Sequence, residues 1–112
     1  MRIVRLDDGD VTRLMLLGEL DLDTGDLFEE QVAAALGDRP EELVVDLHGL
    51  TFCDSSGIDV LLAARETAAR AGIAFRVHRP HGIVLRSLTV TGVHDLLVGD
   101  PGSDRETAGG RA

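Results

Sequence analysis

The sequence predicts an α/β fold, a mixed and mostly parallel sheet with helices packed on it. Strand-like apolar segments alternate with amphipathic helical segments in the order β-β-α-β-α-β-α-β. Hydrophobic residues make up 44% of the chain, but the aromatics are only three Phe, so Leu, Val, Ile and Ala are expected to form the core. A chain of 112 residues is long enough for one such domain and too short for two.

A hairpin and a helix open the predicted fold. Alternating apolar and polar residues at 3–6 predict a strand that enters an acidic, glycine-containing turn, and residues 11–19 predict the returning strand. Apolar residues at helical spacing predict an amphipathic helix over 25–36. Asp23 and Thr24, just before it, are candidate N-cap residues.

Strand–helix units follow in the rest of the chain. The apolar run at 42–47 is typical of a central strand covered on both faces. Helical spacing predicts helices over 56–70 and 82–91, with a strand at 74–78 between them. A last short strand is expected at 93–98.

Apolar residues nearly vanish after residue 98. We therefore expect one domain over 1–98 and a flexible C-terminal tail over 99–112. The first residues are charged every few positions, which is unlike a signal peptide, and no apolar run approaches the roughly 20 residues that span a bilayer. The protein is expected to be soluble and cytoplasmic.

The charge of the chain restricts its partners. The formal net charge is −9, so phosphate backbones and anionic lipids would be repelled. The shortage of aromatic residues also argues against base stacking. We expect no direct nucleic-acid or membrane binding, and a protein partner with a basic face.

No catalytic, metal or cofactor motif is apparent. Asp21, Asp23 and Asp26 resemble the start of a calcium loop, but Gly25 is misplaced and no Glu follows at the twelfth position of that motif. Nucleotide-binding glycine motifs are missing, and the single Cys53 suits a buried structural thiol. We expect no enzymatic activity, no cofactor and no metal.

The segment Asp54-Ser55-Ser56-Gly57 is the candidate site. It follows a strand and opens a helix, so a serine hydroxyl there is placed to cap free backbone amides. The same position favours a phosphate, because the amides and the helix dipole stabilise its charge. The residues alone leave both interpretations open. A serine hydrolase would require a histidine within hydrogen-bond distance of Ser55 or Ser56.

Three motifs at matching separations resemble the STAS domain of anti-sigma factor antagonists. They are Gly18-Glu19-Leu20-Asp21, then Val45-Asp46-Leu47-x-x-Leu50-x-Phe52-x-Asp54-Ser55-Ser56-Gly57, and finally Thr91-Gly92-Val93. Each motif alone is weak, but together they are specific, and the resemblance extends over about residues 3–98. It implies the STAS fold and a partner-switching cycle.

In that cycle the unphosphorylated protein binds an anti-sigma factor, which is also a serine kinase of the GHKL ATPase type, and so releases the sigma factor. The kinase phosphorylates the first serine of the motif, here Ser55, and a PP2C-type phosphatase reverses this. The resemblance implies a partner-binding surface comprising Asp21, Asp23, Thr24, Asp54, Ser56, Gly57 and Asp59. Asp59 departs from the family pattern, because relatives often have a small residue there.

An alternative keeps the fold without the switch: a STAS scaffold or adaptor subunit of a larger signalling or transport assembly. The intact serine motif favours the switch, since an adaptor needs no phosphoacceptor. The sequence leaves the oligomeric state open between a monomer and a weak dimer.

Overall fold

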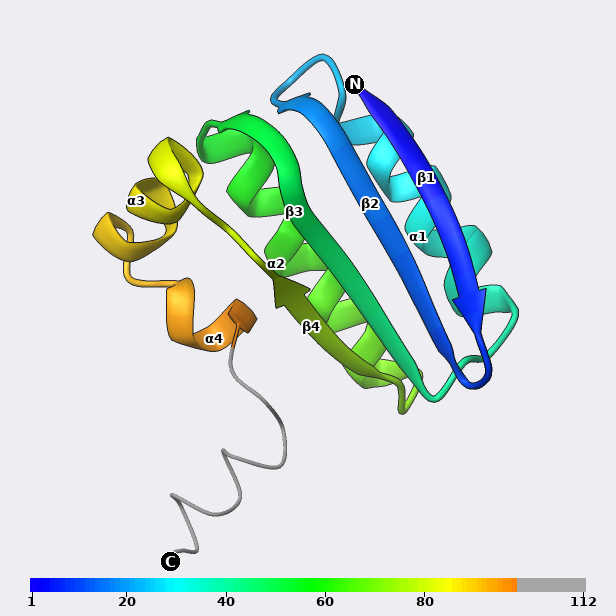
Figure 1. Ribbon diagram of the computed structural model, residues 1–112. Coiled ribbons are helices and arrows are strands. Elements are labelled where there is room, and N and C mark those ends of the chain that lie inside the picture. The colour runs from blue at the N-terminus through cyan, green and yellow to red at the C-terminus, as the bar shows by residue number, and fades with distance from the viewer. Residues whose placement is uncertain (99–112) are drawn as a thin grey trace, which may run out of the picture.

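One four-stranded sheet organises the protein (Figure 1). The computed structural model describes residues 1–98, so the predicted tail at 99–112 lies outside the described residues. The elements are β1 (Arg2–Asp8), β2 (Val11–Leu20), α1 (Gly25–Gly37), β3 (Glu42–Cys53), α2 (Ser55–Arg70), β4 (Ala74–His78), α3 (Gly82–Val90) and α4 (His94–Val98). In residues 1–98 no helix is long and apolar enough to cross a membrane.

The predicted α/β class and the antiparallel edge are confirmed. The strand order is β1-β2-β3-β4, with β1 antiparallel to β2 and the other two pairs parallel. Asp8 pairs with Val11, so only Gly9 and Asp10 form the hairpin turn, and Gly9 has a φ of 63°. In Figure 1, α1 and α2 lie behind the sheet, while α3 and α4 lie beside its β4 edge.

The central strand β3 is longer than the predicted 42–47. It continues to Cys53, which pairs with Leu20 of β2 after two irregularities in the register. Position 49 inside the strand requires glycine, because an added Cβ would collide with the Leu17 side chain and lie 3.0 Å from a β2 carbonyl oxygen. The predicted strand ended before His48 and Gly49, because a polar residue followed by glycine is typical of a strand end. In the structure the glycine instead allows β3 to pack closely on β2.

The strand predicted at 93–98 is wrong, because the segment forms helix α4. The Leu97 amide donates to the Val93 carbonyl at 3.1 Å, and Gly92 before it adopts a φ of 78°. Leu97 is fully buried, and α4 packs against β4, α2 and α3. A short apolar run does not by itself distinguish a helix from a strand, and here burial of Leu97 determines the outcome.

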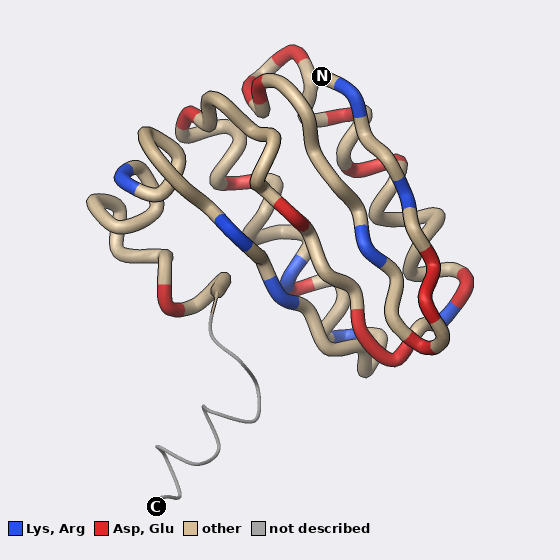
Figure 2. The backbone as a smooth tube through the Cα atoms, in the orientation of Figure 1, with Lys and Arg blue, Asp and Glu red and all other residues tan. Residues whose placement is uncertain are grey.

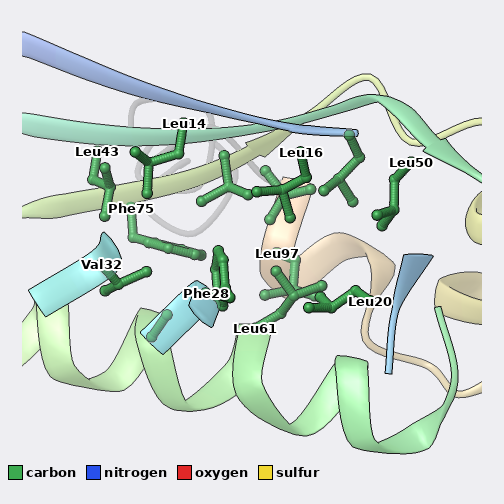
Figure 3. Close-up of a cluster of buried hydrophobic side chains, with 14 of the residues drawn as sticks. Leu14, Leu16, Leu20, Phe28, Val32, Leu43, Leu50, Leu61, Phe75 and Leu97 are labelled. Atoms are coloured by element: carbon green, nitrogen blue, oxygen red, sulfur yellow. The ribbon is translucent and has the colours of Figure 1, made fainter. Parts of the chain in front are cut away.

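The core lies between the sheet and the helices (Figure 3). As expected, it is mostly aliphatic, with Phe28 and Phe75 as its aromatic members. The close-up shows side chains from β2, β3 and β4 meeting those of α1, α2 and α4: Leu14, Leu16, Leu20, Leu43, Leu50, Phe75, Phe28, Val32, Leu61 and Leu97. Leu20 at the end of β2 and Ile58 in the first turn of α2 both belong to this close-packed core, which holds the two segments in place.

Charged residues lie along the strands of the sheet (Figure 2). Asp46 of β3 is only 2% exposed, and its carboxylate accepts two hydrogen bonds from Arg79, at 3.2 and 2.7 Å. Arg13 lies 3.5 Å from the same carboxylate, and the His48 amide donates to it at 2.9 Å. This cluster links β2, β3 and the end of β4, and it compensates the burial of the Asp46 charge.

Candidate functional site

The carboxyl ends of β2 and β3 bring two loops together. Leu20 pairs with Cys53, and the Asp54 amide donates to the Leu20 carbonyl at 3.4 Å. Because the two strands are parallel, the loop that follows β2 lies beside the turn that opens α2. We call this surface, formed by residues 21–24 and 54–59, the Ser55 edge.

Asp54, and not a serine, caps helix α2. Its Oδ1 accepts a hydrogen bond from the Gly57 amide at 2.9 Å. A carboxylate is a strong N-cap acceptor and also interacts favourably with the helix dipole. The Ser55 side chain is exposed at the first helical position, and within residues 1–98 its hydroxyl makes no hydrogen bond. Serine capping of α2 is therefore excluded.

Replacing Asp54 by Ala is expected to lower the free energy of unfolding by about 1 kcal/mol, the usual cost of losing an N-cap. Asp54→Asn is the matched control, because an amide oxygen still accepts the Gly57 hydrogen bond. Urea unfolding followed by circular dichroism measures both. Equal stability of the Ala and Asn variants would show that the cap contributes nothing.

Gly57 allows α2 to approach β2 closely. An added Cβ would lie 2.5 Å from the Leu20 carbonyl oxygen and 2.7 Å from the Cys53 Sγ. Both atoms belong to buried residues, so neither has room to move. Glycine at this position therefore fixes where the first turn of α2, with Ser55, stands relative to the sheet.

Asp21 and Thr24 stabilise the loop after β2. The Asp21 carboxylate accepts from the amides of Asp23 and Thr24 at 3.0 and 3.2 Å, while the Thr24 hydroxyl accepts from the Asp21 amide at 2.9 Å. Thr24 is at the N-cap of α1 but its side chain makes no cap hydrogen bond, because the hydroxyl is directed back to Glu19. Of the two N-cap candidates, Thr24 occupies the N-cap position and Asp23 does not, and the Thr24 side chain orders the loop instead of capping the helix.

The Ser55 edge carries several carboxylates. Asp23 and Asp59 are exposed, while Asp21 and Asp54 are half-buried. Asp59 lies four residues after Ser55 in α2, so both side chains are on one face of the helix. Figure 2 shows acidic positions in the β2–α1 loop and around the start of α2. The structure thus gathers all the residues that were assigned to partner binding from the sequence.

A cavity of about 380 Å³ separates the start of α2 from α3. Its lining residues are Cys53, Asp54, Ser55, Ile58, Ile83, Arg86, Ser87, Val90 and Thr91. In α3 only Val84 and Leu88 are buried, so Ile83 and Val90 are 57% and 75% exposed. The sequence predicted this helix but not its exposed apolar face, since only two of the segment's apolar residues pack on the core.

Two further apolar side chains lie near the site. Leu22, between Asp21 and Asp23, is 80% exposed, and Phe52 at the end of β3 is also exposed. Neither was predicted from the sequence. The sequence did contain a signal for Leu22: a single leucine between two aspartates in a loop has no neighbouring apolar residue to bury it, which indicates exposure.

Cys53 is a buried thiol, as predicted. Burial, with a further contribution from the Asp54 charge, raises the pKa of this thiol to about 11. At neutral pH it is protonated, and it therefore lacks the thiolate needed for nucleophilic attack.

The histidines do not serve the two serines. His81 Nε2 lies 2.5 Å from the His48 carbonyl oxygen, and the two imidazole rings are 5.4 Å apart. Among residues 1–98, neither the Ser55 nor the Ser56 hydroxyl is hydrogen-bonded to a histidine, so the serine–histidine pair of a hydrolase is not formed there. The described residues also contain no group of three His, Cys, Asp or Glu that could hold a metal ion.

Known proteins share this architecture. RsfB, an anti-sigma-F factor antagonist of Mycobacterium tuberculosis, is 29% identical over 103 residues, covering 83% of this chain and 84% of RsfB. The crystal structure of an anti-sigma factor antagonist from Mycobacterium paratuberculosis has a TM-score of 0.75 at 28% identity, covering 96% of this chain and 92% of that one.

Similarity of fold extends to more distant structures. The anti-sigma factor antagonist SpoIIAA in its unphosphorylated form has a TM-score of 0.66 at 19% identity, with 97% of each chain covered. A family model described as "Mlab, STAS domain" matches residues 5–99, which is most of the chain. Together with the sheet order and the Asp54–Gly57 turn, this match shows that the chain belongs to the STAS domain family.

Proposed function

We propose that this protein is a cytoplasmic anti-sigma factor antagonist that binds an anti-sigma factor through the Ser55 edge and releases it when Ser55 is phosphorylated. The observation that carries the proposal is the free Ser55 hydroxyl, exposed at the first position of α2 because Asp54 caps the helix. The similarity to RsfB and to the M. paratuberculosis protein, both anti-sigma factor antagonists, supports the class of partner.

The composition of the surface supports a protein partner. Leu22 of the Ser55 edge, with Ile83 and Val90 of the adjoining helix α3, supplies exposed apolar area, whereas Asp23 and Asp59 supply negative charge. A partner with an apolar centre and a basic rim matches this surface. Among the remaining members of the partner-binding set, Asp21, Thr24, Asp54 and Gly57 shape the surface and position Ser55, and Ser56 follows it in the first turn of α2.

Phosphorylation would alter this surface without unfolding it. A partner kinase of the GHKL type transfers the γ-phosphoryl group of ATP to Ser55 Oγ, which loses its proton, and ADP leaves. The product carries about −1.5 to −2 charges, which the free amides at the start of α2 stabilise. In a bound complex the same charge would lie between carboxylates and a desolvated partner, and would drive dissociation. A PP2C-type phosphatase then hydrolyses the ester and regenerates the hydroxyl.

Intact-protein mass spectrometry tests the proposal. We expect the wild type, incubated with ATP and candidate anti-sigma kinases, to gain one phosphate. Ser55→Ala should gain none, and the control Ser56→Ala should be labelled like the wild type. A kinase that forms a stable complex but transfers no phosphate would contradict the switch and favour an unswitched adaptor. Labelling that persists in Ser55→Ala would place the modified residue elsewhere.

A further inference from the structure

We propose that Arg86 of α3 binds the phosphate of phosphorylated Ser55 across the cavity between α2 and α3. Phosphorylation would then add a negative charge to the Ser55 edge and at the same time neutralise the positive charge of Arg86 on the adjoining helix α3. This inference rests on the proposed function, of which it names the intramolecular partner.

The two groups line the same cavity. Ser55 contributes to the cavity from the first turn of α2, and Arg86 contributes from the middle of α3. Both side chains are exposed, and between them lies open space of about 380 Å³, enough for a phosphate and its hydrogen-bonding shell. Arg86 supplies the cavity's only basic side chain among the described residues.

Arg86 is exposed and has no partner among residues 1–98. Most other arginines of the described chain are already engaged by acidic groups or carbonyls, as seen for Arg5, Arg13, Arg65, Arg70, Arg76 and Arg79. Within residues 1–98 the Arg86 guanidinium makes no hydrogen bond or ion pair. Turning it toward a phosphate therefore breaks no hydrogen bond or ion pair within residues 1–98.

The chemistry of the cavity favours this contact. Ile58, Ile83 and Val90 make much of its wall apolar, so these side chains offer no group that competes with Arg86 for a phosphate. A guanidinium offers two parallel N–H donors that match two phosphate oxygens, in addition to the amides of α2. Without such a cation the dianion would face mainly the carboxylates of Asp54 and Asp59. Arg86 thus adds to the stabilisation by the α2 amides and offsets the repulsion by these carboxylates.

The same residue has a different role before modification. On an acidic surface, an unpaired arginine attracts a carboxylate of the partner. Once Ser55 is phosphorylated, Arg86 is occupied within the chain and that attraction is lost. The switch would therefore depend on charge gained at Ser55 and on charge withdrawn at Arg86.

The full chain with phosphoserine incorporated at position 55 during translation tests this contact without any kinase. A ³¹P NMR titration measures the second pKa of the phosphate, which is about 6 when unperturbed. We expect Arg86→Gln to raise it by about 0.7 or more relative to the chain that retains Arg86, the effect of one cation at contact distance even in water-like surroundings. Arg70→Gln removes an equal charge at the far end of α2 and should leave the titration unchanged.

Two outcomes overturn the inference: an identical titration with and without the Arg86→Gln substitution, or an equal shift caused by Arg70→Gln. Circular dichroism of Arg86→Gln checks that the fold is retained. The result is independent of the kinase assay, so the two proposals fail separately. If Ser55 is phosphorylated by a kinase but Arg86→Gln leaves the phosphate pKa unchanged, the proposed switch stands and the Arg86 contact fails. If Arg86→Gln raises the phosphate pKa but no kinase phosphorylates Ser55, the contact stands and the proposed switch fails.

Discussion

Gly57→Ala is expected to destabilise the protein by about 2–3 kcal/mol and to abolish partner binding. The new methyl group would lie 2.5 Å from the Leu20 carbonyl oxygen and 2.7 Å from the Cys53 Sγ, both within a packed region. Relief requires the first turn of α2 to move away from β2, and overpacking of this kind typically costs about 1–3 kcal/mol. Displacement of that turn also moves Ser55 and breaks the Asp54–Gly57 hydrogen bond.

Gly37→Ala is the matched control. Gly37 is the last residue of α1, nothing lies within 4 Å of an added Cβ, and its φ is not positive. The substitution should be neutral or stabilise the helix by up to about 1 kcal/mol. Urea unfolding and binding to the anti-sigma factor measure both variants. If Gly57→Ala proves as stable as Gly37→Ala, the close approach of α2 to β2 does not constrain position 57.

Much of the fold was predictable from local pattern. Alternation located the hairpin, and helical spacing located α1, α2 and α3 to within about one residue, because amphipathic elements of this length carry their own signal. The segment at 93–98 carries no such signal. Its helical form depends on the burial of Leu97 against β4 and α2, which only the assembled fold provides.

The sequence predicted which residues form the candidate site, but not which side chain caps α2 or how α3 lies beside it. The Asp54–Gly57 segment marked the start of a helix, but serine and aspartate cap equally well, so the sequence did not determine which side chain does so. The structure assigns the cap to Asp54 and leaves Ser55 exposed. The approach of Arg86 to this site depends on how α3 docks on the end of β3, a tertiary contact with no counterpart in the local sequence.

Asp46→Ala is expected to lower the free energy of unfolding by about 3 kcal/mol at neutral pH. The substitution leaves Arg79, Arg13 and the His48 amide without their shared acceptor in a site where the carboxylate is 2% exposed. Removing one partner from a buried pair typically costs about 3–5 kcal/mol, and the lower end applies because the guanidinium of Arg79 reaches solvent. Asp46→Asn preserves an acceptor for the His48 amide and should lose less.

The pH dependence of stability separates the charge of Asp46 from its hydrogen bonds. Burial acts to raise the pKa of this carboxyl, but the hydrogen bonds from Arg79 and His48, with the charges of Arg79 and Arg13, lower it below its usual 3.8. A lowered acid pKa stabilises the folded state above pH 3.8, and this stabilisation is lost as the pH falls through the native value. Urea unfolding between about pH 5 and 2 should therefore show a shallower acid decline for Asp46→Asn than for wild type. Asp7, whose pKa is also lowered, contributes equally to both proteins, so equal declines would show that the Asp46 ion pairs do not stabilise the fold.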